Sequence, residues 1–109
     1  MSAALPPAPP SLNALLGLNR VIHEPVRLAI MSVLAGAQEV EFKYLEAALG
    51  LSRGNLSSHA TKLEDAGYLK VHKAFRGKVP VTSYRITPLG QQTLDSYWVA
   101  LRGAAPPPS

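Results

Sequence analysis

Hydrophobic residues recur every three to four positions along most of the chain, which is the period of an amphipathic helix. Five helices are predicted, over residues 11–19, 25–36, 43–49, 53–66 and 88–103. Apolar residues nearly encircle the second of these helices, which is typical of a central core helix. The first and last helices are apolar along one side only, so each needs a surface to pack against.

Residues at the helix ends support these bounds. Ser52 and Thr87 stand where an N-cap side chain accepts a backbone N–H, and Pro88 fits the first turn of a helix. Gly50 and Gly67 stand where glycines commonly end helices. The residues expected to point inward from the third and fourth helices are Leu45, Ala48, Leu49, Leu56, Ala60 and Leu63.

Two later segments alternate between apolar and polar residues, as strands do. They cover residues 68–75 and 82–86, and the residues between them, 76–80, combine turn formers with positive charge. We expect these segments to form a β-hairpin whose tip is basic. Residues 40–42 are expected to add a short extended piece.

Proline separates a folded region from two tails in this chain of 109 residues. We expect residues 1–10 and 104–109 to be disordered arms and residues 11–103 to form one domain. The absence of cysteine excludes disulfides and thiolate metal sites. No apolar run approaches the roughly 20 residues needed to cross a membrane, so we expect a cytoplasmic protein without a membrane partner.

Positive charge is concentrated in the second half of the chain. The net charge of the whole chain is +4, yet residues 70–85 alone contain five Lys or Arg and no acidic residue. Positive side chains so close together in sequence repel one another unless they face an anionic partner. Nucleic acid is the natural candidate for that partner. The alternative is a basic surface that only contacts solvent.

The order of a short helix, a tight turn, a longer helix and a charged hairpin is that of a helix-turn-helix with a wing. Four stretches carry a resemblance to a known family: HEPVRLAI at 23–30, LSSH at 56–59, LEDAGYL at 63–69 and YRITPLG at 84–90. They resemble the small winged-helix transcription regulators related to the MarR and ArsR groups.

This resemblance implies a mainly α fold with a small β-hairpin, and a homodimer that binds near-palindromic double-stranded DNA. Two departures matter. The chain lacks the cysteine ligands of many ArsR-type metal sensors, and it is shorter than a typical MarR protein. The resemblance therefore implies no metal and no cofactor, and it leaves a small-molecule effector unknown.

The helix over 53–66 is the expected recognition helix, because its polar side has the chemistry that reads base edges in a major groove. The residues expected to face outward together for this purpose are Asn55, Ser58 and Lys62. The residues at the borders of this side, suited to phosphate contact or to packing, are Arg53, Ser57 and His59. The alternative is an ordinary solvated helix surface.

The hairpin is the expected wing, which would enter a minor groove or clamp phosphates. Its candidate residues are Lys73, Arg76, Gly77, Lys78 and Arg85.

The terminal helices carry more apolar surface than a small core readily covers, so we expect a twofold dimer. The candidate dimer residues are Leu12, Leu15, Leu16, Leu94, Tyr97, Trp98 and Leu101. In the alternative, both helices simply close the core of a monomer.

Enzyme chemistry finds no support in the sequence, because its three histidines are isolated and it has no glycine-rich phosphate loop. The leading hypothesis is a dimeric, sequence-specific DNA-binding regulator that represses by occupying its operator. The competing hypothesis is a winged-helix module that binds another protein, since a fold alone does not fix a function.

Overall fold

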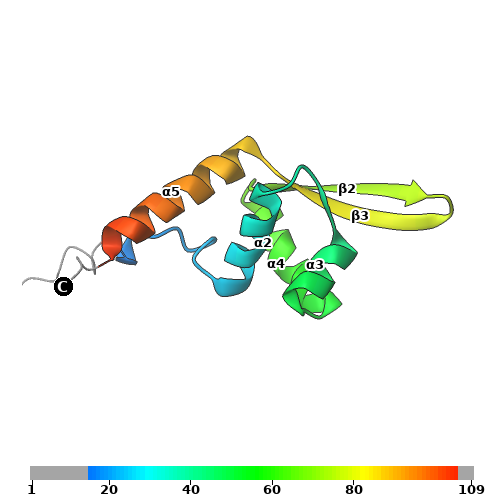
Figure 1. Cartoon of the computed structure of the whole chain (residues 1–109), viewed down its shortest axis with the longest axis horizontal. Helices are drawn as coiled ribbons and strands as arrows, with labels where there is room; N and C mark the ends of the chain where they lie inside the picture. Colours follow the sequence, from blue (N-terminus) through cyan, green and yellow to red (C-terminus); the bar gives the residue numbers. More distant parts are fainter. Residues whose placement is uncertain (1–14, 106–109) are drawn as a thin grey trace, which may run out of the picture.

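The computed structural model describes residues 15–105 and shows a body of helices from which a long hairpin extends (Figure 1). The elements follow one another as α2 (Pro25–Ala35), β1 (Val40–Glu41), α3 (Phe42–Leu49), α4 (Arg53–Asp65), β2 (Leu69–Arg76), β3 (Val79–Ile86) and α5 (Pro88–Ala104). In Figure 1, α5 and the hairpin extend from the helical body in opposite directions. No helix within residues 15–105 is long and apolar enough to span a membrane.

The three strands form one antiparallel sheet in the order β1-β3-β2. Strands β2 and β3 pair from Leu69 opposite Ile86 out to Arg76 opposite Val79. The turn is therefore only Gly77 and Lys78, and Gly77 takes a φ of 66°. A glycine first in a two-residue loop gives the tight turn whose twist matches the strands.

The predicted five-residue hairpin tip was wrong, because Val79 and Pro80 belong to β3. Strand β1 reaches β3 only at Ser83 and Tyr84. Beyond these residues no strand in the described part of the chain neighbours that edge of β3, and proline, which lacks an N–H, is tolerated at such an edge.

The core lies where α2, α3, α4 and the sheet meet. Its fully buried side chains include Ile30, Met31, Leu34, Leu45, Leu56 and Leu63, which confirms α2 as the central core helix. Ala48 was expected inside but is exposed. The reason is that Phe42 begins α3 instead of ending the strand, so the buried side of this helix is formed by Phe42, Leu45 and Leu49.

The segment before α2 also departs from its prediction. The helical residues Leu15 and Leu16 end before Asn19, which was expected to continue the helix. The Asn19 side chain instead accepts the backbone N–H groups of Val21 and Ile22, at 2.9 and 3.1 Å, and donates to the Tyr68 hydroxyl. Asparagine commonly competes with helix formation in this way. The rest of the predicted first helix lies outside the described residues.

Helix α5 begins as predicted, with Thr87 as its N-cap and Pro88 in the first turn. The Thr87 hydroxyl accepts the Gly90 N–H at 2.9 Å and donates to the Gly67 carbonyl at 2.6 Å. This one side chain therefore ties the start of α5 to the end of α4. The helix continues one residue past Gly103, to Ala104.

Candidate nucleic-acid interface

Helices α3 and α4 form the predicted helix-turn-helix. Gly50 ends α3, and the Ser52 hydroxyl accepts the Asn55 N–H at 3.2 Å, which caps α4. Leu56, Ala60 and Leu63 are buried on the inner side of α4, as predicted. Because these three residues fix the rotation of the helix, they also fix which of its residues face outward.

The three residues predicted to contact bases, Asn55, Ser58 and Lys62, are all exposed. Arg53 and Ser57 are exposed as well, and the Arg53 guanidinium lies 5.8 Å from the centre of the Phe42 ring. A cation over an aromatic face is attracted to it, which holds the start of α4 against α3. His59 is half-buried and faces α2. The predicted residues of α4 thus divide into an exposed set and one side chain held at a helix junction.

The register of the wing separates its predicted residues onto two faces. Lys73 pairs with Thr82, and Lys70 pairs with Arg85. Since successive side chains along a strand alternate between faces, Lys73 and Arg85 lie on opposite sides of the hairpin. Lys73 faces the space beside α4, and Arg85 faces away from it.

A groove of about 750 Å³ separates α4 from the wing. Arg53, Ser57 and Thr61 line it from α4, since residues four apart share one side of a helix. Lys73 and Thr82 line it from the wing. Sequence reasoning missed Thr61 and Thr82 as groove residues. The spacing of Thr61 from Arg53 and Ser57 was the available signal for Thr61.

The groove carries charges of both signs, because Glu41, Glu46 and Glu64 line it together with the basic residues. Glu41 forms an ion pair with Arg76 near the end of the wing. Side chains in this pair are 75% and 40% exposed, and ion pairs so open to solvent contribute little to stability. Arg76 can therefore leave Glu41 at small cost. Burial, followed by the negative charge of Glu64, raises the pKa of the Tyr84 phenol, so Tyr84 adds no negative charge here.

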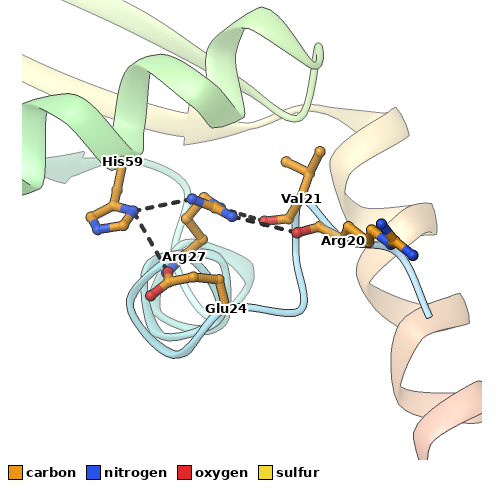
Figure 2. Close-up of polar contacts among 5 residues, drawn as sticks. All are labelled: Arg20, Val21, Glu24, Arg27 and His59. Atoms are coloured by element: carbon orange, nitrogen blue, oxygen red, sulfur yellow. Dashed lines mark hydrogen bonds and ion pairs between the residues drawn. The ribbon is translucent and has the colours of Figure 1, made fainter. Parts of the chain in front are cut away.

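A polar cluster joins the start of α2 to α4 (Figure 2). Glu24 caps α2 by accepting the Arg27 backbone N–H at 2.7 Å. The His59 Nδ1 atom lies 3.3 Å from Nη1 of Arg27 and 3.6 Å from Oε2 of Glu24. Burial alone would raise the pKa of Glu24, but the backbone N–H groups of Arg27 and Val26 and the charges of His59 and Arg27 outweigh it. The pKa of Glu24 is therefore lowered from its ordinary value of 4.5, and this carboxylate is ionised at neutral pH.

The residues predicted for a dimer interface fall into two groups. Leu94 and Tyr97 are buried in the core of the chain itself, and Trp98 and Leu101 are half-buried against it. Leu15 and Leu16 are exposed, as is Val99, which the prediction did not include. Leu12 lies outside the described residues. Leu15, Leu16 and Val99 thus leave apolar surface exposed on the two terminal segments of the described chain.

Residues 26–104, which contain the helix-turn-helix and the wing, match a family model described as a winged helix DNA-binding domain. This chain belongs to that winged-helix family. The prediction of a small winged-helix regulator, mainly α with a β-hairpin wing, is confirmed at this level. The family binds DNA, which agrees with the prediction that the chain is not an enzyme.

Individual proteins agree with this assignment. An uncharacterised protein of Methanocaldococcus jannaschii is 34% identical over 79 residues, which cover 72% of this chain and 85% of that protein. A solved structure from Pyrococcus horikoshii OT3, described as a transcriptional regulator homologue, superimposes with a TM-score of 0.78 at 29% identity. The superposition covers 85% of this chain and 91% of that one. HlyU from Vibrio cholerae shares the fold, with a TM-score of 0.57 at 21% identity over 79% of this chain and 86% of its own.

Proposed function

We propose that this winged-helix protein is a homodimeric transcription regulator that recognises a specific operator and represses by occupying it. The observation that carries the proposal is the exposed polar side of α4 beside a basic wing. Lys62 on α4 and Lys73 and Lys78 on the wing are all exposed. A positive surface of this kind attracts the phosphate backbone, and the side chains of α4 then read the bases.

The position of each side chain suggests its role. Asn55, Ser58 and Lys62 contact base edges in the major groove, where amides, hydroxyls and ammonium groups all find partners. Arg53 and Ser57, at the edge of the groove beside the wing, contact the phosphates that pass between α4 and the wing.

The wing has roles of its own in this proposal. Lys73 contacts the same phosphates as Arg53 and Ser57, because it lines the groove from the opposite side. Lys78, at the turn, reaches the adjacent minor groove. Arg76 joins it there after leaving Glu41.

The proposal is tested by binding to a labelled duplex of random sequence, followed by fluorescence anisotropy between about 50 and 200 mM salt. We expect the logarithm of the association constant to fall steeply with the logarithm of the salt concentration. The slope should be about −0.9 for each phosphate that the protein neutralises. Steep dependence would then justify selecting the operator from a random pool. Absence of binding at the lowest salt would contradict DNA recognition and favour the competing function, a module that binds another protein.

The dimer rests on the apolar side chains that the monomer leaves exposed near its ends. Leu16 is 68% exposed and Val99 is 63% exposed. Helix α5 also extends away from the helical body, which makes its surface accessible to a second copy (Figure 1). A twofold dimer would place two α4 helices about 34 Å apart, so that they enter successive major grooves of a near-palindromic site.

Sedimentation equilibrium at micromolar concentration is expected to give twice the chain mass of 11.6 kDa. The double variant Leu16→Asp/Val99→Asp is expected to sediment as a monomer, because each buried carboxylate would lack a partner. The control Phe75→Asp/Val79→Asp replaces two exposed apolar side chains of the wing and should leave the dimer intact. A wild-type monomer, or equal dissociation of both variants, would contradict this interface.

A further inference from the structure

Within residues 15–105, His59 is the one predicted contact residue of α4 whose side chain makes polar contacts with α2 and its N-cap. Its side chain is 22% exposed, and its Nδ1 atom faces both Arg27 and Glu24 at the start of α2. Asn55 and Lys62, its neighbours on α4, are exposed by comparison. The imidazole therefore has an orientation that the rest of the fold controls.

The two contacts of Nδ1 are alternatives, because they use the same atom in opposite roles. A guanidinium can only donate, so Nδ1 must accept from Arg27 when the ring is neutral. A carboxylate can only accept, so Nδ1 must carry the proton when it pairs with Glu24. In both of these states the other ring nitrogen, Nε2, carries a hydrogen, whereas a neutral ring that donated from Nδ1 to Glu24 would have none there. The contact of Nδ1 with Arg27 is the shorter of the two, at 3.3 Å against 3.6 Å for Glu24, so the geometry favours the neutral ring with its hydrogen on Nε2.

That donor points away from α2. In Figure 2 the second ring nitrogen of His59 lies on the side of the ring opposite the dashed contacts. No group within residues 15–105 forms a hydrogen bond with it, and it is not sealed from solvent. An outward N–H donor next to the predicted base-contacting residues has the chemistry of a phosphate contact.

Arg27 is itself fixed by the turn that precedes α2. Its Nε donates to the Val21 carbonyl, and its Nη2 lies 3.4 Å from the Arg20 carbonyl. The remaining terminal nitrogen, Nη1, makes the contact with His59. The three nitrogens of a planar guanidinium can donate to three acceptors in these directions at once, whereas a lysine ammonium carries all its donors on one nitrogen.

We propose that Arg27 and Glu24 are positioning residues for DNA binding, which hold the His59 imidazole with its Nε2–H directed at a phosphate of the bound duplex. This inference rests on the proposed function and adds to it residues that do not touch DNA. A partner at one ring nitrogen of a histidine determines which nitrogen carries the hydrogen, and it also fixes the direction in which the other nitrogen points.

The first arm of the test needs no DNA. Long-range ¹H–¹⁵N spectra of the full chain, recorded at rising pH until the ring signals stop changing, report the neutral tautomer of each histidine. His59 is identified by the loss of its signals in His59→Gln. We expect His59 to be in the Nε2–H form in the wild type and to become a mixture of tautomers in Arg27→Met. An Nδ1–H ring in the wild type would overturn the proposal.

The second arm measures affinity for the random duplex at fixed low salt. Arg27→Met and His59→Gln are each expected to lose about tenfold, the worth of one hydrogen bond to a charged group. The double variant should lose no more than either single variant, because both remove the same contact. Arg27→Lys, which keeps the charge, should recover only part of the lost affinity. In the ¹H–¹⁵N spectra, Glu24→Gln should keep the neutral Nε2–H tautomer of His59.

The control is Arg20→Met, which removes one positive charge from the same turn but keeps the carbonyl that Arg27 contacts. We expect it to bind DNA nearly as well as the wild type. Additive losses in Arg27→Met/His59→Gln, or an equal loss in Arg20→Met, would show that Arg27 acts only through charge or folding. If the wild type does not bind the duplex at all, the proposed function fails, and the tautomer of Arg27→Met still decides whether Arg27 positions His59.

Discussion

Replacing Gly90 with alanine is expected to destabilise the fold by about 3 kcal/mol or more, the upper range for overpacking a rigid site. A Cβ atom at this position would lie 2.1 Å from the Tyr68 carbonyl oxygen and 2.9 Å from its carbon. These are backbone atoms, and the same oxygen accepts the Thr87 N–H at 3.0 Å. Relief of the clash therefore requires α5 to move away from the start of β2.

Chemical denaturation followed by circular dichroism measures this loss, and the matched control is Gly103→Ala in the same helix. No atom of residues 15–105 lies within 4 Å of a Cβ at Gly103, so alanine there should leave stability unchanged or raise it by a few tenths of a kcal/mol. Both substitutions add one methyl group to α5. Equal stabilities of the two variants would show that the close approach of Gly90 to Tyr68 does not limit the fold.

The elements that could be predicted are those whose signals are local. Ser52 and Thr87 are N-caps, and Pro88 stands in the first turn of α5, because capping depends on residues only a few positions apart. The period of the buried residues in α4 was equally clear. Each of these signals lies within one helix, so the packing of the rest of the chain did not alter it.

The elements that were mispredicted depend on distant partners. Asn19 ends the first helix partly because its amide meets Tyr68, which lies 49 positions further along the chain. Phe42 joins α3 and packs its ring 6.1 Å from that of Tyr84. Pro80 extends a strand because β1 is too short to cover that edge of β3. None of these partners can be identified from residues nearby in sequence.

The candidate site shows the same division. Helical period alone was sufficient to place Asn55, Ser58 and Lys62 on the exposed side of α4. It could not show that Arg76 pairs with Glu41, because that pair joins the end of the wing to β1. Nor could composition show that Arg85 lies on the far face of the hairpin from Lys73, since this depends on strand register.

The double variant Lys62→Glu/Lys78→Glu is expected to lose about a hundredfold in affinity for the random duplex at about 100 mM salt, roughly tenfold for each reversed charge. Lys62 is exposed on α4 and Lys78 is exposed at the turn of the wing. The two positions therefore test both halves of the proposed DNA surface together. The slope of log affinity against log salt concentration should also become shallower by about two, because two cations in the grooves no longer release counterions from the duplex.

A loss of overall positive charge would weaken DNA binding at any position, so the control must carry the same change in net charge. Lys70→Glu/Arg102→Glu provides it, because Lys70 pairs with Arg85 on the far face of the wing and Arg102 lies in the last turn of α5. We expect this control to lose less than about threefold in affinity at about 100 mM salt, where charges more than about 10 Å from the phosphates are largely screened. Equal losses in the two double variants would mean that binding follows net charge alone, and the assignment of α4 and the wing turn as the DNA surface would then be wrong.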